Sequence, residues 1–247
     1  MRRRILGVIP ARFASSRFPA KALAPLAGKP MIQHVYERAQ MARYLDKLII
    51  ATDDERIYSA ARDFGANVRM TRADHPSGTD RVAEVASAEN ADLIVNIQGD
   101  EPLIDPAAID GAALALLDEP GIPMGTLKRR IEDPAEAASP NVVKVVTDRD
   151  SNALYFSRCP IPFYRAQDGM HYKHIGLYVY RRDFLLKYSD LPVGPLEKAE
   201  CLEQLRALEN GYRIRVAETE YDSLGVDTPE DLQRAAFLFD ASFAKVT

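Results

Sequence analysis

The stretch Leu93-Ile94-Val95-Asn96-Ile97-Gln98-Gly99-Asp100-Glu101-Pro102 predicts the fold of this chain. It begins as a short apolar run and ends in Gly, Pro and two acids. Such a run is typical of a buried parallel strand, and open α/β sheets bind ligands at the carboxyl ends of their strands. Asp100 is therefore predicted to lie where a metal-bound nucleotide binds. The alternative is a solvated strand end, where acidic residues are common.

Outward from this stretch, apolar runs alternate with helical patterns. Strands are predicted at 5–9, 48–51 and 93–97, each followed by a helix, at 30–43, 54–64 and 106–117. Further strands are predicted at 142–146, 153–156, 176–180 and 214–216, and further helices at 196–208 and 229–239. This alternating order predicts an α/β fold with a parallel sheet and helices on both of its faces.

Composition limits the class of protein. With 247 residues and 47% hydrophobic content, the chain can bury the core of one large α/β domain. The apolar residues 5–9 are ended by Pro10 and Arg12, far short of a secretory signal, and no later run is long enough to cross a membrane. Cys159 and Cys201 lack metal-site or disulfide-framework spacing, so a reducing, cytoplasmic location is expected.

Charge is distributed unevenly along the chain. The net charge of −4 argues against a nucleic-acid-binding protein, yet residues 1–36 hold seven Lys and Arg and no acid. A local positive site in an otherwise acidic protein suits a small polyanion. For Arg2 to Arg4, the alternative is a plain basic tail.

The segment Pro10-Ala11-Arg12-Phe13-Ala14-Ser15-Ser16-Arg17-Phe18-Pro19-Ala20-Lys21 follows the first predicted strand. Arg12, Arg17 and Lys21 bring three cations with no acid between them, which predicts a bound phosphate. The segment has no glycine and no Gly-Lys-Ser/Thr ending, so a P-loop NTPase and a dinucleotide dehydrogenase are both disfavoured. A surface basic loop is the alternative.

Seven segments, taken together and in this order, resemble the 3-deoxy-manno-octulosonate (Kdo) cytidylyltransferases. They are residues 10–21, 74–81, 96–102, 155–158, 174–178, 202–206 and 225–231. The resemblance spans nearly the whole chain and implies a Rossmann-like nucleotidyltransferase with a mainly parallel central sheet. It also implies one domain over 1–247, with an inserted dimerisation and acceptor-binding elaboration at about 130–220. One position departs from the family: Ala20 stands where glycine is frequent, and a left-handed backbone there would strain its Cβ.

The resemblance implies a reaction and its participants. In the family, the anomeric hydroxyl of Kdo attacks the α-phosphate of CTP with Mg²⁺, giving pyrophosphate and CMP-Kdo for lipopolysaccharide biosynthesis. A cytoplasmic homodimer, with the segment from Arg130 to Ser139 and later strands at its interface, and with no nucleic-acid or membrane partner, is implied as well. Alternatives are an acylneuraminate or amino-Kdo acceptor, or a non-catalytic nucleotide-sugar sensor.

Residues at the nucleotide follow from the same resemblance. The catalytic residues implied are Arg12, Lys21, Asp100 and Asp227, the last two as Mg²⁺ ligands. Implied nucleotide contacts are Pro10, Ala11, Arg12, Ser15, Arg17, Lys21, Arg72, Asp74, Ser77 and Gly78. Asp227 precedes Thr228-Pro229-Glu230-Asp231, a helix start that would hold it at the rim of the same sheet. The alternatives are a helix-dipole role for Asp227 and a plain helix cap for Ser77.

Residues at the acceptor are implied in the same way. Arg158 and Arg165 match positions suited to the Kdo carboxylate. The positions that match the hydroxyl-facing set are Gln98, His174, Tyr178, Glu203 and Gln204. Alternatives are a core role for Tyr178 and solvated helix positions for Glu203 and Gln204. A metal pair of His171 and His174 is disfavoured because a third ligand is missing.

Overall fold

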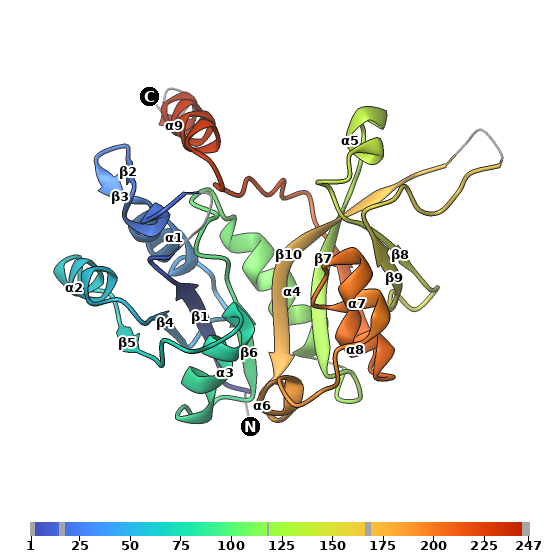
Figure 1. The fold of residues 1–247 in the computed structure, drawn as a ribbon, viewed down its shortest axis with the longest axis horizontal. Helices are drawn as coiled ribbons and strands as arrows, with labels where there is room; N and C mark the ends of the chain where they lie inside the picture. The colour runs from blue at the N-terminus through green and yellow to red at the C-terminus, as the bar shows by residue number, and fades with distance from the viewer. Residues whose placement is uncertain (1–2, 15–17, 118, 166–168, 244–247) are drawn as a thin grey trace. The chain divides into compact units, whose positions relative to one another are not determined.

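The computed structural model describes residues 3–14, 18–117, 119–165 and 169–243 (Figure 1). The chain forms two compact units. The first comprises Met1–Asp110 and Ser223–Thr247, and the second comprises Gly111–Asp222. The second unit includes the range predicted as an acceptor-binding elaboration, and the single-domain assignment stays a prediction.

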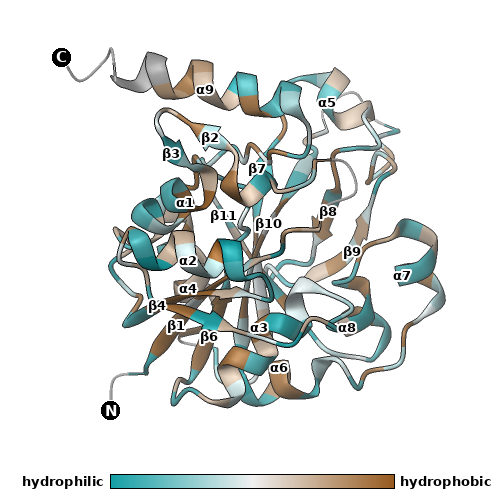
Figure 2. Ribbon diagram, turned by 60° about the vertical axis from the view of Figure 1, so that its left-hand side comes forward, coloured by the Kyte–Doolittle hydropathy of each residue, from teal (hydrophilic) through white to brown (hydrophobic). Residues whose placement is uncertain are grey.

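The first unit is built on four parallel strands. In spatial order they are β6 (Leu93–Asn96), β1 (Ile5–Ala11), β4 (Lys47–Thr52) and β5 (Val68–Met70). All of β6 and most of β1 and β4 are buried, and these strands are predominantly hydrophobic in Figure 2. Continuous apolar runs of this kind occur where helices cover both faces of a parallel sheet. The predicted α/β fold is therefore confirmed.

Helices cover this sheet on its two faces. Those of the first unit are α1 (Met31–Ala39), α2 (Glu55–Asp63), α3 (Gly78–Ser87) and α9 (Pro229–Phe243), with α4 (Pro106–Leu117) continuing into the second unit. The side chain of Ile9, on β1, and that of Ile32, on α1, both lie beside Gly99. The next residue of β1, Pro10, instead lies against Gly78 at the start of α3. Successive strand residues point to opposite faces, so α1 and α3 cover opposite faces of β1.

Short elements and α9 complete the first unit. These elements are the 3₁₀ helix η1 (Lys21–Leu23) and the paired strands β2 (Pro25–Leu26) and β3 (Lys29–Pro30). Leu26 and Met31 pack with Val226, Ala235 and Phe239 in one buried cluster. Burial of these apolar side chains anchors the C-terminal helix beside the segment that carries Lys21.

The second unit is a mixed sheet with short helices. Strand β7 (Met124–Arg130) runs parallel to β11 (Ile214–Glu218) and antiparallel to β10 (Tyr172–Arg181). Strand β10 also pairs with β8 (Lys144–Thr147), which pairs with β9 (Ala153–Ser157). The helices are α5 (Pro134–Ala138), α6 (Arg182–Tyr188), α7 (Pro195–Glu200) and α8 (Leu205–Glu209). The register of β10 against β7 shifts between Ile175 and Val179, so that Gly176, Leu177 and Tyr178 face the single residue Thr126.

The predicted helix over 196–208 is wrong as one element. Helix α7 ends at Glu200 because Cys201 adopts a left-handed conformation with φ 52°, and α8 begins only at Leu205. The carboxylate of Glu209 accepts hydrogen bonds from the backbone N–H groups of Leu196 and Glu197, at 2.9 and 3.0 Å. The end of α8 therefore caps the start of α7, and the two helices form a compact hairpin.

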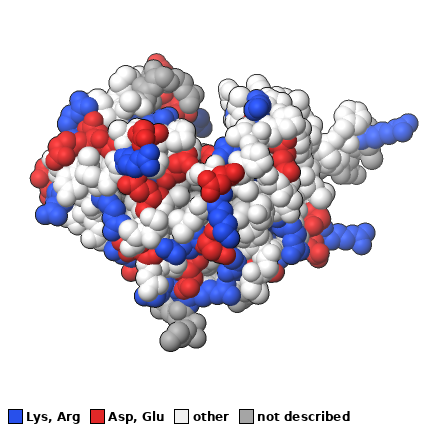
Figure 3. Space-filling view, turned by 60° about the horizontal axis from the view of Figure 1, so that its bottom comes forward, with Lys and Arg blue, Asp and Glu red and all other residues white. Residues whose placement is uncertain are grey.

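Within the described ranges, no helix is long and apolar enough to cross a membrane. On the face in Figure 3, Lys and Arg of the described residues lie interspersed with Asp and Glu. Nucleic-acid-binding surfaces instead gather their cations in one patch or stripe. That face does not have the charge pattern of a nucleic-acid-binding surface.

Candidate active site

A cavity of about 520 Å³ lies in the first unit, where β1 and β6 end. Its lining comes from five separate segments of the chain. The lining residues are Pro10, Ala11, Arg12, Lys21, Ala22, His75, Pro76, Ser77, Gly78, Arg81, Gln98, Gly99, Asp100 and Asp227. A Cβ on Gly99 would lie 2.7 Å from the carbonyl oxygen of Pro10, a distance that only glycine avoids. Gly99 thus lets the turn after β6 bring Asp100 close to the end of β1.

Lys21 joins the two predicted metal carboxylates. Its Nζ lies 2.6 Å from Oδ2 of Asp100 and 3.0 Å from Oδ1 of Asp227. It also donates to the carbonyl oxygen of Val226 at 3.2 Å. Burial alone would lower the pKa of Lys21, but the charge of Asp100 and the hydrogen bonds to both carboxylates outweigh it and raise that pKa. Lys21 is therefore a cation, and the three side chains carry one excess negative charge.

The predicted helix start holds Asp227 in place. The hydroxyl of Thr228 accepts from the backbone N–H of Asp231 at 3.2 Å, and the carboxylate of Asp231 accepts from the N–H of Thr228 at 3.0 Å. This is the predicted capping box. The same carboxylate accepts from the N–H of Asp227 at 3.1 Å. Because the side chain of Asp227 is bonded to Lys21 in the cavity, its position serves more than the helix dipole.

The basic loop folds back on itself before Lys21. Ala20 has φ 58° and ψ 19°, and its N–H donates to the carbonyl of Phe13 at 3.0 Å. This is the left-handed conformation expected to strain an alanine at that position. Arg12 lines the cavity, whereas Ser15 and Arg17 lie outside the described residues.

The start of α3 forms another wall of the cavity. Ser77 accepts from the N–H of Asp80 at 3.1 Å and donates to its carboxylate at 2.6 Å, so the alternative role of Ser77 as a helix cap is present, and its nucleotide contact stays a prediction. A Cβ on Gly78 would lie 3.6 Å from Pro10, an ordinary contact, so the fold itself does not require glycine there. Backbone N–H groups at a helix start bind anions or acceptors readily.

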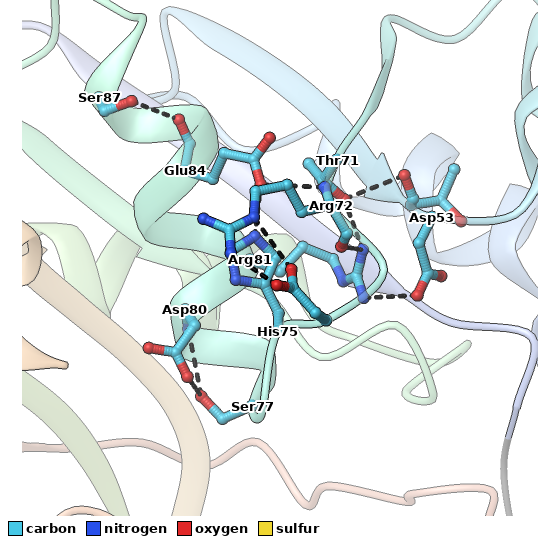
Figure 4. A network of polar contacts seen from close by, with 11 residues as sticks. Asp53, Thr71, Arg72, His75, Ser77, Asp80, Arg81, Glu84 and Ser87 are labelled. Atoms are coloured by element: carbon cyan, nitrogen blue, oxygen red, sulfur yellow. Dashed lines mark hydrogen bonds and ion pairs between the residues drawn. The ribbon is translucent and has the colours of Figure 1, made fainter.

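A polar network supports this wall from behind (Figure 4). Arg81 is only 4% exposed and donates to Asp53 at 2.9 Å, to Thr71, and to the carbonyl of Arg72 at 3.3 Å. His75 is hydrogen-bonded to Glu84. His75 and Arg81 line the cavity as well, and neither was predicted from the sequence, although both belong to the recognised segment 74–81.

Arg72 and Asp74 bond to each other instead of lining the cavity. Their ion pair measures 2.6 Å, and the side chains are 70% and 66% exposed. The backbone N–H of Arg72 donates to Glu84 at 3.1 Å. What the structure shows for Arg72 is thus a link to the network behind the wall, and a nucleotide contact by either side chain stays a prediction.

A second group of predicted residues gathers in the second unit. The rings of His174 and Tyr178, both on β10, lie 5.4 Å apart between centroids, and the Tyr178 hydroxyl donates to Oε1 of Gln204 at 3.2 Å. Gln204 is 3% exposed, so the solvated-helix alternative is wrong for this residue. Burial raises the pKa of Tyr178, and the negative charge of Glu203 raises it further. Tyr178 is therefore a hydroxyl donor at neutral pH.

Arg158 is held by two residues that the sequence analysis did not select. Glu200 accepts from the N–H of Arg158 at 2.9 Å and from the Ser157 hydroxyl at 2.6 Å, and its carbonyl accepts from Nε of Arg158 at 2.8 Å. The fully buried Lys144 donates to the carbonyls of Ser139, Val142 and Arg158. Arg165 is exposed, beyond Pro162.

Comparison with known proteins agrees with this geometry. A family model described as Cytidylyltransferase matches residues 6–214. Proteins named 3-deoxy-manno-octulosonate cytidylyltransferase from Solibacter usitatus and Geobacter sulfurreducens are 73% and 57% identical over 244 and 242 residues. The matches cover 98% and 93% of this chain and 97% of each relative. The chain belongs to the 3-deoxy-manno-octulosonate cytidylyltransferase family.

A solved member of this family has the same fold. It is a CMP:2-keto-3-deoxy-manno-octonic acid synthetase complexed with CTP, 46% identical, with a TM-score of 0.93. The match covers 97% of this chain and 99% of that protein. The resemblance predicted from the sequence motifs is confirmed.

Replacing the strained alanine of the family loop should stabilise the fold. A left-handed alanine lowers the free energy of unfolding by about 1 to 2 kcal/mol. Glycine removes this strain, but the greater conformational entropy that it gives the unfolded chain offsets about 0.4 to 1 kcal/mol of the gain. We expect Ala20→Gly to raise the melting temperature by about 1 to 3 °C, measured by calorimetry. The control is Ala24→Gly in the same loop. Ala24 has φ −56° and is 7% exposed, so this substitution should lower the melting temperature. Equal losses in both variants would contradict strain at Ala20.

Proposed function

We propose that this chain transfers CMP from CTP to the anomeric hydroxyl of Kdo, releasing pyrophosphate and giving CMP-Kdo for lipopolysaccharide synthesis. The observation that carries the proposal is the Lys21, Asp100 and Asp227 cluster in the cavity of a chain from this family. Relatives 73% and 57% identical bear the name of the Kdo enzyme, and the solved family member was complexed with CTP.

The cavity supplies positive charge for the triphosphate. Arg12 and Lys21 line it, and the N-terminus of α3 adds backbone N–H donors. In the reaction the acceptor hydroxyl gives up its proton and its oxygen forms a bond to the α-phosphorus, while the bond from that phosphorus to the bridging oxygen breaks and pyrophosphate leaves. Enzymes accelerate such transfers mainly by positioning and by stabilising the phosphate charge. Lys21, held by two carboxylates, has a fixed position from which to do this.

The donor set fits Mg²⁺. This ion is usually held by one or two carboxylates together with substrate phosphates and water. Asp100 and Asp227 converge on one ammonium group, and the cluster carries one excess negative charge. Within the described ranges no group of three or more His, Cys, Asp or Glu could hold a metal, so phosphate and water would complete the shell. Bound there, Mg²⁺ would neutralise phosphate charge and lower the pKa of the attacking hydroxyl.

The second unit offers groups that suit a sugar acid. Nε and Nη1 of Arg158 donate to the carbonyls of Glu200 and Pro140, and among the described residues nothing is bonded to Nη2. An arginine edge of this kind matches a carboxylate. His174, Tyr178 and Gln204 would face the hydroxyls. Roles for Arg165, Glu203 and the cavity residue Gln98 in acceptor binding rest on the resemblance.

We propose a cytoplasmic enzyme with small-molecule partners. Both cysteines are unpaired and exposed, which is typical of proteins in a reducing compartment. CTP accounts for the cavity that Arg12 and Lys21 line, and Kdo for the hydroxyl-binding groups of the second unit.

Pyrophosphate release tests the proposed function directly. CTP with Mg²⁺ is offered Kdo, an amino derivative of Kdo and an acylneuraminate. We expect Kdo to be preferred and Lys21→Ala to lower kcat by about 10² or more, because the phosphate charge loses its fixed counter-charge. The control is Lys29→Ala, which removes a surface ion pair with Glu37 and should leave kcat unchanged. Release with another acceptor, but not with Kdo, would overturn the acceptor assignment.

The two carboxylates should act as one unit. We expect Asp100→Asn and Asp227→Asn each to abolish most turnover, and the double variant to be scarcely slower than either single one. The measurement is kcat as a function of Mg²⁺ concentration. Losses that multiply in the double variant, or a normal Mg²⁺ dependence in Asp227→Asn, would show that the carboxylates do not share a metal.

We propose that the enzyme is a homodimer that uses the apolar surface of the second unit. Leu154 is 62% exposed, Phe163 88% and Met170 48%, and large exposed apolar patches mark association surfaces. In the segment Arg130–Ser139, predicted at the interface, Ile131 and Ala137 are buried in the monomer. The exposed apolar side chains of Leu154, Phe163 and Met170 are thus better placed for an interface than those of Ile131 and Ala137.

Charge placed on this surface should separate the subunits. We expect a dimer for the unmodified chain and a monomer for Phe163→Glu in light scattering at micromolar concentration, because a carboxylate cannot be buried there unpaired. Phe237→Glu, on α9 at a side chain 72% exposed, serves as the control and should stay dimeric. A monomer before any substitution would refute the dimer.

A further inference from the structure

Thr126 of β7 lies behind the predicted acceptor residues of β10. Where β10 shifts register, the Thr126 hydroxyl lies 3.0 Å from the carbonyl oxygen of Ile175 and 2.9 Å from that of Leu177. It also lies 2.9 Å from Nε2 of His174. The Thr126 side chain is fully buried. A single hydroxyl therefore contacts three polar groups of the neighbouring strand.

The number of protons available fixes the direction of these bonds. A hydroxyl has one proton, and a carbonyl oxygen can only accept. If the Thr126 proton pointed to Nε2 of His174, two carbonyl oxygens would face the hydroxyl oxygen without a proton between them. The proton must therefore point to the carbonyls, and Nε2 must donate to the hydroxyl oxygen. This assigns His174 to the Nε2–H tautomer.

The other ring nitrogen of His174 is left as an acceptor. The ring lies between Phe156, 5.0 Å away between centroids in an edge contact, and Tyr178. Desolvation in this setting lowers the pKa of His174 to about 3, so the ring is neutral at physiological pH. Among the described residues no hydrogen bond reaches Nδ1. Its lone pair is thus available to a ligand.

Gln204 has a hydrogen-bond donor without a partner among the described residues, whereas His174 has an acceptor. Its Oε1 accepts from the Tyr178 hydroxyl, and its Nε2 is buried with no partner among the described residues. The cluster thus presents one acceptor, Nδ1 of His174, and one donor, Nε2 of Gln204. A ligand hydroxyl can donate to Nδ1 of His174, whereas Nε2 of Gln204 is buried within the protein.

We propose that Thr126 is a positioning residue that sets the acceptor specificity of this site by fixing the His174 tautomer. The proposal rests on the proposed function for the identity of the acceptor. With Nε2–H bonded to Thr126, Nδ1 accepts a hydrogen bond from a hydroxyl of a polyhydroxylated sugar acid. Thr126 lies outside all seven recognised segments.

The first test reads the tautomer without substrate or turnover. The protein is labelled with ¹⁵N-histidine, and the signal of His174, one of four histidines, is assigned by its loss in His174→Gln. We expect the nitrogen pattern of a neutral Nε2–H ring at pH 7. An Nδ1–H ring or an imidazolium would overturn the proposal. Because no activity is needed, a failure of the proposed function would show separately, as absent pyrophosphate release with Kdo.

The second test removes the hydroxyl while keeping the shape. Thr126→Val should raise the KM for Kdo about tenfold or more and leave the KM for CTP within about twofold, because only the acceptor site loses a fixed hydrogen-bond partner. The matched control Thr126→Ser keeps the hydroxyl and should retain both KM values and the tautomer.

The remaining outcomes are equally decisive. Thr126→Val with an unchanged His174 spectrum and an unchanged KM for Kdo would overturn the proposal, as would an equal rise in both KM values. If Thr126→Val does not fold, Thr126→Cys replaces it, since a thiol is a poor acceptor. The expected shifts in tautomer and in KM for Kdo are the same.

Discussion

The ammonium group of Lys21 is the interaction on which the first site depends. It binds Asp100, 79 positions later, and Asp227, 206 positions later, so that three distant segments meet. The backbone N–H of Val226 also donates to the carbonyl of Asp100 at 2.8 Å, which joins two of these segments directly. Burial opposes the charge of Lys21, and the carboxylates more than offset this effect. Lys21 therefore holds three segments of the cavity lining together.

Much of this site could be predicted because its determinants are local. An apolar run with an acidic tip fixes both a buried strand and the place of Asp100 at its end. The helix cap formed by Thr228 and Asp231 depends on only four consecutive residues, 228–231. The departure at Ala20 could be identified because glycine is frequent there in the family, and the structure shows the left-handed backbone that would strain an alanine.

What could not be predicted depends on tertiary partners. Arg72 and Asp74 lie just before and in a recognised segment, yet their side chains form an ion pair with each other. No sequence pattern predicts this pairing. The periodicity over 196–208 fits one helix, but Cys201 is left-handed and ends the first of two short helices. Hydrogen bonds of Glu209 and Glu197 hold these two helices together. Thr126 acquires its contacts only from a register shift in the opposing strand.

The two groups of proposed binding residues solve different physical problems. A triphosphate is recognised by its charge, so the first site needs cations held at fixed points, and Lys21 is held by carboxylates. A sugar acid with many hydroxyls offers little charge beyond one carboxylate, so it must be recognised by the direction of hydrogen bonds. Direction requires that each donor and acceptor be fixed, including the tautomer of a neutral histidine. The buried hydroxyl of Thr126 does for His174 what the two carboxylates do for Lys21.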